Sequence, residues 1–279
     1  MKYGIFTFPT EYSMRADQLA RAVEERGFDS LWFPEHTHIP VARRSPYPAG
    51  GELPKDYSHI ADPFVGLAAA AAVTKRIKLG TAICLVVEHD PIVLAKQVAS
   101  LDLLSGGRFI FGIGAGWNAE EMENHGTAFD TRYRLMRERM DAMKALWTQN
   151  EAEYHGKFVN FGPLWSYPKP VQKPWPPIFF GGHTPAARQR VVDLYDGWMP
   201  TIMRVQDLLA GVEDLRRRAA EAGRDPKSID VTVIWVRADR ARLDSFEAAG
   251  VDRVVLGVPS ADGDVVSRKL EELVKLARI

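Results

Sequence analysis

Cysteine is almost absent from this sequence, since Cys84 is the single one among 279 residues. A lone thiol cannot form a disulfide within the chain, and disulfide-dependent secreted folds are therefore excluded. The opening residues, Met1-Lys-Tyr-Gly-Ile-Phe6, are not followed by a long apolar signal segment. We therefore expect a cytoplasmic protein.

A charge surplus and a long hydrophobic run are also missing. The 36 basic residues balance the 36 acidic ones, so the chain has no electrostatic footprint for nucleic acid or for an anionic membrane. The longest apolar stretch, near residues 64–73, is far shorter than the roughly 20 residues that span a bilayer. These absences predict that the protein has no nucleic-acid or membrane partner.

The sequence does contain a regular alternation of buried strands and helices. Apolar runs without polar alternation are typical of parallel strands covered on both faces. We expect eight strands, at residues 2–8, 30–33, 77–87, 108–113, 177–180, 197–201, 229–236 and 252–258. Helical segments lie between them, and a last helix closes the chain. This pattern predicts a single α/β domain over residues 1–279, a (β/α)8 TIM barrel with insertions at about 37–62 and 149–177. The second insertion is expected to hold a hairpin near residues 154–158.

The active site of such a barrel lies at the C-terminal ends of its strands. Polar and glycine-rich candidates at the predicted strand ends are Thr7, Glu35, His36, His38, residues 81–84, 112–118 and 181–184, Pro200, Thr201 and Arg237. In the stretch Ser30-Leu-Trp-Phe-Pro-Glu-His-Thr-His38 an apolar run comes directly before a carboxylate and two imidazoles. Pro34 ends the strand because it has no amide proton to donate.

Three interpretations of this stretch are open. Glu35, His36 and His38 could ligate a metal, as in metal-dependent barrel hydrolases, but only His183 among the other histidines follows a predicted strand. A histidine beside a carboxylate also suits proton transfer, because its ordinary pKa lies near neutrality. The third interpretation is a strand end held by hydrogen bonds alone.

Two glycine-rich strand ends are candidates for cofactor binding. Gly181-Gly-His-Thr184 precedes a predicted helix, where free amides and the helix dipole favour a phosphate; alternatively Thr184 simply caps the helix. Glycines in Gly112-Ile-Gly-Ala-Gly-Trp117 could let a flat ring approach the backbone, or they could serve close packing.

Several motifs together resemble the bacterial luciferase-like monooxygenase superfamily, most closely its F420-dependent branch. They fall in order between residues 1 and about 201. Three of them lie in the stretches 30–38, 112–117 and 181–182 described above. The others are Asp62-Pro-Phe64, Leu79-Gly-Thr-Ala-Ile83, Asp90-Pro91 with Leu94-Ala-Lys-Gln97, Leu101-Asp-Leu-Leu-Ser-Gly-Gly-Arg108, Pro177-Ile-Phe-Phe180 and Asp196-Gly-Trp198.

The resemblance implies a barrel that binds coenzyme F420, or alternatively FMN, in its mouth. It places a non-proline cis peptide at Ala82–Ile83, in a bulge of the third strand that backs the cofactor ring. Gly114, Gly116 and Trp117 would line the ring pocket. The cofactor phosphate would bind at Gly181, Gly182, His183 and Thr184.

His36 matches a histidine of the relatives, and the resemblance implies an acid–base or orienting role for it and for Glu35. Relatives that oxidise sugar phosphates also use a glutamate after the fourth strand, which Glu120 or Glu121 matches approximately, and a tryptophan that residues 39–44 lack.

The predicted function is hydride transfer between F420 and a small organic substrate, in a homodimer, with no metal. The alternatives are an FMN-dependent monooxygenase served by a flavin or F420 reductase partner, a metal-dependent hydrolase using His36 and His38, and a non-catalytic flavin-binding protein.

Overall fold

The computed structural model describes residues 1–201, 204–236 and 239–279. Within these ranges, parallel strands form a ring, which the pairing of β3 with β5 closes. The strands of the ring are β1 (Lys2–Phe6), β2 (Ser30–Phe33), β3 (Lys78–Thr81), β4 (Cys84–Leu85), β5 (Phe109–Gly114), β8 (Ile178–Gly181), β9 (Gly197–Met199), β10 (Asp230–Val236) and β11 (Arg253–Gly257). With β3 and β4 as two parts of the third strand, this is the predicted (β/α)8 barrel.

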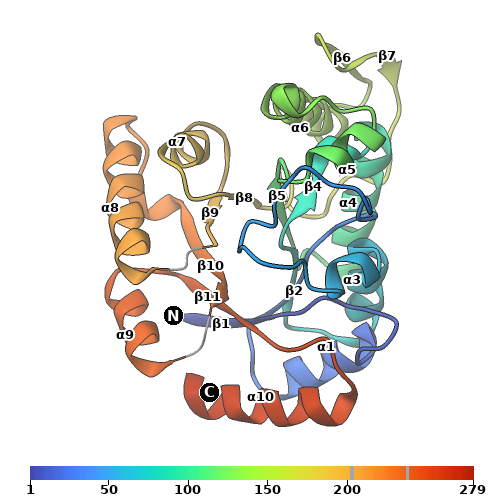
Figure 1. The fold of residues 1–279 in the computed structure, drawn as a ribbon. Coiled ribbons are helices and arrows are strands. Elements are labelled where there is room, and N and C mark those ends of the chain that lie inside the picture. Colours follow the sequence, from blue (N-terminus) through green and yellow to red (C-terminus); the bar gives the residue numbers. More distant parts are fainter. Residues whose placement is uncertain (202–203, 237–238) are drawn as a thin grey trace.

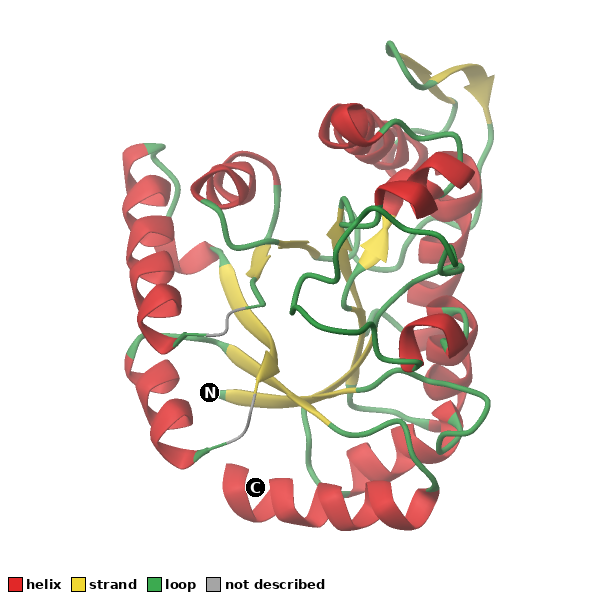
Figure 2. Cartoon of the chain, viewed as in Figure 1, coloured by secondary structure: helices red, strands yellow, loops and turns green. Residues whose placement is uncertain are grey.

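Helices surround the strands, as Figures 1 and 2 show. The outer layer is made of α1 (Ala16–Glu25), α3 (Pro63–Val73), α4 (Pro91–Ser105), α6 (Arg132–Thr148), α7 (Pro185–Leu194), α8 (Val205–Glu221), α9 (Arg240–Ala248) and α10 (Gly263–Ala277). Gly27 has a positive φ of 81° directly after the C-cap residue of α1, a conformation that glycine tolerates at the end of a helix. No helix in the described ranges is both long and apolar enough to cross a bilayer.

The barrel interior is separate from the larger core between strands and helices. Trp32 on β2 is fully buried inside the barrel, and its indole N–H donates to Ser30 Oγ at 2.8 Å. A Cβ atom on Gly80 would lie 2.2 Å from the Trp32 ring. Glycine at position 80 is therefore what makes room for the indole.

The third strand differs from the sequence prediction. A continuous strand was predicted over 77–87, whereas β3 ends at Thr81, β4 ends at Leu85, and the chain turns into the 3-10 helix η1 (Val86–Glu88). The carbonyls of Val86 and Val87 accept hydrogen bonds from the side chains of Arg139 and Thr127, at 2.9 and 2.6 Å, and are thereby occupied outside the ladder. The cis peptide that the resemblance implied at Ala82–Ile83 is confirmed, and it separates β3 from β4.

The strands β1 and β9 end two residues before their predicted ends, at Phe6 and Met199, and Thr201 forms only an isolated bridge to Ile234. The last strand, β11, is one residue shorter at each end. Arg237, a predicted strand-end residue, lies outside the described residues.

Both insertions have local structure. The first contains the short helix α2 (Asp56–His59), which the sequence pattern did not reveal, and the loop around it crosses the open face of the barrel (Figure 1). The second contains the predicted hairpin, as strands β6 (Ala152–His155) and β7 (Asn160–Leu164), which projects beyond α6. Two further short elements, α5 (Ala119–Asn124) and η2 (Phe129–Thr131), connect β5 to α6, and η3 (Pro226–Ser228) precedes β10.

Candidate active site

His36 follows β2 at the mouth of the barrel, with 7% of its side chain exposed. Its Nδ1 lies 2.7 Å from Oε2 of Glu121, a fully buried carboxylate on α5. The other oxygen of Glu121 accepts the backbone N–H of Thr37 at 3.1 Å. A neutral imidazole that donates through Nδ1 leaves Nε2 as an acceptor, and Nε2 of His36 has no partner among the described residues. Glu121 therefore fixes both the ring of His36 and the start of the loop.

Glu35 does not pair with His36, although the sequence prediction treated them as neighbouring pocket groups. Its side chain is buried in the barrel wall, where Leu85 N donates to Oε2 at 2.6 Å and His89 Nε2 lies 2.9 Å from Oε1. Burial alone would raise the pKa of Glu35, but His89 and the Leu85 amide outweigh it and lower this pKa. Burial would likewise lower the pKa of His89, and Glu35 raises it. Each partner thus favours the charged form of the other.

Aromatic rings surround His36. The ring centroids of Tyr57 and Trp117 lie 5.3 and 5.8 Å from that of His36, and Tyr47 lies 5.4 Å from Tyr57. Trp117 was among the predicted pocket residues. The two tyrosines lie in the insertion at residues 37–62, and their approach to His36 could not be predicted because it depends on how this insertion folds over the mouth.

The predicted ring-binding residues Ala82, Ile83 and Gly114 come together with Gly181 from neighbouring strands. A Cβ on Gly114 would lie 2.0 Å from Ile83 Cδ1, and one on Gly181 would lie 3.1 Å from Ile83 Cγ2. In this structure the two glycines therefore make room for the side chain of Ile83. This is the close-packing role that the sequence left open. Gly116, with φ 73°, turns the chain toward Trp117.

The predicted phosphate-binding stretch begins α7. Thr184 Oγ1 accepts from Ala187 N at 3.1 Å, so its side chain is the N-cap of this helix. Among the described residues no acceptor is found for the amides of His183 and Thr184. Free amides at the start of a helix are suited to an anion. Thr184 can therefore cap the helix while the amides of His183 and Thr184 remain available to an anion, so the two interpretations do not exclude each other.

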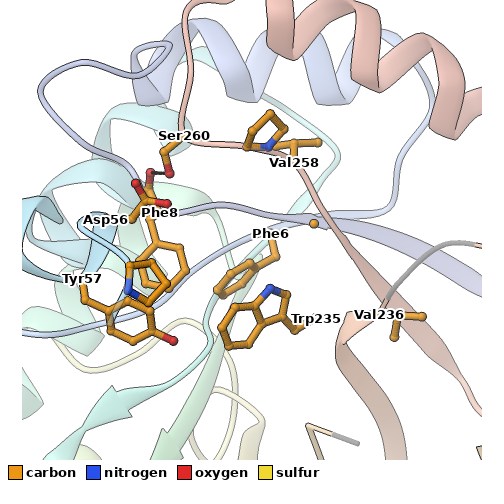
Figure 3. A pocket seen from close by; sticks show the side chains of 11 residues that line it. Phe6, Phe8, Asp56, Tyr57, Trp235, Val236, Val258 and Ser260 are labelled. Atoms are coloured by element: carbon orange, nitrogen blue, oxygen red, sulfur yellow. Dashed lines mark hydrogen bonds between the residues drawn. The ribbon is translucent and has the colours of Figure 1, made fainter. Parts of the chain in front are cut away.

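A cavity of about 410 Å³ lies beside Tyr57 at the ends of β1, β10 and β11. Figure 3 shows the rings of Phe6, Phe8, Tyr57 and Trp235 gathered around it. Trp235 has a positive φ of 59°, rare for a bulky residue, at the point where the register of β10 with β11 shifts. The sequence gave no sign of this conformation, because residues 229–236 read as a plain buried strand.

The metal-hydrolase alternative required His36 and His38 to act together. His38 instead bonds Thr37 Oγ1 through Nδ1 and Asn124 through Nε2, at 2.9 and 2.8 Å. Over the described part of the chain, neither histidine belongs to a cluster of three metal-ligating side chains.

Comparison with known sequences identifies relatives across nearly the whole chain. A protein of Mycobacterium tuberculosis, itself uncharacterized, is 41% identical over 276 residues, covering 98% of this chain and 97% of the relative. The FMNH2-dependent dimethylsulfone monooxygenase of Pseudomonas putida is 35% identical over 158 residues, which are 56% of this chain and 43% of the enzyme.

Solved structures share the fold. The monooxygenase RslO1 from Streptomyces bottropensis has a TM-score of 0.82 at 22% identity, covering 99% of this chain and 98% of that one. An F420-dependent secondary alcohol dehydrogenase, solved with an F420–acetone adduct, has a TM-score of 0.77 at 19% identity over the full length of both chains.

The family model described as luciferase-like monooxygenase matches residues 1–242. This match covers the barrel from β1 into α9, including the His36–Glu121 pair and the start of α7. The chain belongs to the luciferase-like monooxygenase family and is an enzyme.

Proposed function

We propose that this enzyme transfers a hydride between coenzyme F420 and a small organic substrate. The observation that carries the proposal is the His36–Glu121 pair: a buried carboxylate holds Nδ1 at 2.7 Å and leaves Nε2 without a partner at the barrel mouth. Hydride transfer to or from a carbon that bears oxygen also needs a proton acceptor or donor at that oxygen. His36 Nε2 supplies it.

The residues present fit a cofactor with a polar ring edge and a phosphate. Asn118, the N-cap residue of α5, is 1% exposed and has no hydrogen-bond partner for Oδ1 or Nδ2 within the described residues. A buried amide of this kind usually has a partner in the working protein. The free amides of His183 and Thr184 are suited to the phosphate. When bound, F420 would accept or donate the hydride at C5 of its ring.

Within this scheme the two carboxylates have different roles. Glu121 positions His36 and offsets the positive charge that the ring gains when it takes up a proton. Glu35 keeps the turn after Ala82–Ile83 in place, since it accepts the amide of Leu85. Glu35 is therefore an orienting residue, one of the two roles expected for it.

The substrate site we assign is the aromatic cavity beside Tyr57. Phe6, Phe8 and Trp235 would cover the apolar body of a small alcohol or ketone, whose oxygen would face His36. The structural likeness to an F420-dependent secondary alcohol dehydrogenase supports this substrate class.

A second candidate is an FMN-dependent monooxygenase, served by a separate reductase. The 35% identity to an FMNH2-dependent dimethylsulfone monooxygenase favours it. The same residues would then hold FMN.

Titration of the purified protein with F420 and with FMN, followed by cofactor fluorescence, separates the two candidates. We expect F420 to bind in the micromolar range and FMN at least about tenfold more weakly, which is about 1.4 kcal/mol. Tighter binding of FMN would favour the monooxygenase. Binding of neither below about 1 mM would contradict both candidates.

The homodimer and the cytoplasmic location stay predictions. Light scattering on the eluting protein measures the first, and fractionation of cells measures the second.

A further inference from the structure

A second cavity of about 410 Å³ lies on the outside of the barrel wall, between η1, the start of α4, α6 and the β6–β7 hairpin. It shares no lining residue with the cavity at the mouth. Its lining consists of Glu88, His89, Asp90, Pro91, Ile92, His125, Arg139, Phe158, Val159, Asn160 and Phe161. Neither the family match nor the proposed function assigns it a role.

Glu88 is the first unusual group in this cavity. The residue is 8% exposed, and neither of its carboxyl oxygens has a hydrogen-bond partner within the described residues. His125 Nε2 is the nearest basic atom, at 3.8 Å from Oε2. Burial, together with the charges of Glu121 and Glu35, raises the pKa of Glu88 to about 9. At neutral pH Glu88 is therefore an uncharged acid with an O–H to donate.

Arg139 is the second unusual group. In the described part of the chain its guanidinium makes one hydrogen bond, from Nη1 to Val86 O, and no ion pair. Its Nε is buried without a partner. Asp90, which also lines the cavity, uses Oδ1 to accept the amides of Ile92 and Val93 at the start of α4. Within the described residues Arg139 thus has unused N–H groups and no direct ion pair, beside an acid without hydrogen-bond partners, while the carboxylate of Asp90 shares its surroundings.

We propose that this cavity binds a small organic carboxylate, held by Arg139 and Glu88. The guanidinium supplies the charge and the N–H groups that carboxylates prefer. The O–H of Glu88 donates to the second ligand oxygen. Phe158 and Phe161 of the hairpin would cover an apolar or aromatic body. This site does not depend on the cofactor or on the proposed reaction.

Ligand-observed NMR with the full-length protein tests the site, with benzoate as probe and benzamide as its uncharged counterpart. We expect benzoate to saturate with a Kd of about 1 mM or below, and benzamide to bind at least about tenfold more weakly. Arg139→Gln should weaken benzoate binding about tenfold or more, because a charged hydrogen bond is lost. Arg137→Gln is the matched control on the same helix, since Arg137 pairs with Asp141 and does not line the cavity.

The pH dependence identifies the part that Glu88 plays. As the pH rises from 7 to 10, Glu88 ionises and repels the ligand, so the affinity of the wild type should fall. Glu88→Gln keeps an N–H donor and gains no charge, so its affinity should stay constant. The charged and titratable groups around Glu88 that remain in both proteins are Glu35, His89, Asp90, Glu121, His125 and Arg139.

Four results would each overturn the proposal. They are equal binding of benzoate and benzamide, unchanged binding by a folded Arg139→Gln variant, the same alkaline loss in Glu88→Gln as in the wild type, and absence of benzoate binding below about 10 mM in the wild type. Thermal melting confirms that each variant is folded.

Discussion

Two carboxylate–histidine pairs at neighbouring strand ends have nearly the same chemistry and different surroundings. Glu121 with His36 and Glu35 with His89 are joined at 2.7 and 2.9 Å, and each carboxylate also accepts one backbone N–H. His36 lies among the aromatic rings of the mouth, whereas His89 packs in the outer wall, 6.3 Å from the ring of Phe64. On the function proposed above, the place of the imidazole relative to the barrel mouth, more than the pair itself, decides whether a histidine can reach a substrate.

The largest expected effect is on catalysis at the mouth. We expect His36→Asn to lower kcat by about 10²–10⁴-fold, the usual contribution of a general acid or base. Its melting temperature should also fall, because the buried Glu121 loses its imidazole partner and keeps only the amide of Thr37, so turnover is compared at a temperature where the variant is folded. Steady-state turnover with saturating cofactor measures the effect. Activity within threefold of the wild type would remove the distinction between the pairs.

Breaking the wall pair should instead cost stability. Glu35→Gln leaves a buried His89 without its counter-charge, and loss of one partner of a buried pair costs about 3 kcal/mol in the free energy of unfolding. Urea unfolding, followed by tryptophan fluorescence, measures it. His155→Gln is the control, since the pair of His155 with Glu153 is exposed. A loss of less than about 1 kcal/mol would mean that the wall pair contributes little.

The pH dependence of the stability gives a second test of the Glu35–His89 pair. The pKa of Glu35 is lowered below its ordinary 4.5, so its contribution is present above pH 4.5 and is lost as the pH falls through the lowered pKa. The pKa of His89 is raised above its ordinary 6.5, so its contribution is present below pH 6.5 and is lost as the pH rises through the raised pKa. The stability gap between wild type and Glu35→Gln should therefore be widest between pH 4.5 and 6.5. A gap that grows above pH 8 would contradict this assignment.

The smallest effect is expected at the wall of the substrate cavity. Trp235→Ala removes apolar contact without touching His36, so we expect KM for the substrate to rise about three- to tenfold and kcat to change little. Initial rates over a range of substrate concentrations measure both constants. A fall in kcat with unchanged KM would show that Trp235 acts on the reacting atoms.

Much of the barrel could be predicted from the sequence because its strands are buried on both faces and read as apolar runs. The cis peptide at Ala82–Ile83 followed from family resemblance, since nothing in the residue types themselves indicates it. The end of the third strand at Leu85 could not be predicted, because side chains of Arg139 and Thr127, far away in the sequence, bind the carbonyls that follow it.

The partners of His36 and Glu35 could not be predicted from the sequence for the same reason. Glu121 is 85 residues from His36, and His89 is 54 residues from Glu35. Adjacency in sequence suggested that Glu35 and His36 form one unit. Neighbouring residues at an extended strand end point to opposite sides, however, and each therefore pairs with a different segment.

The indole of Trp32 bears on the order in which cofactor and substrate bind. It fills the barrel interior against Gly80, so a ligand cannot pass along the barrel axis at this level. If cofactor and substrate both bind at the mouth, the one that lies deeper has to enter first and leave last. We therefore expect compulsory-order kinetics, which product-inhibition patterns reveal.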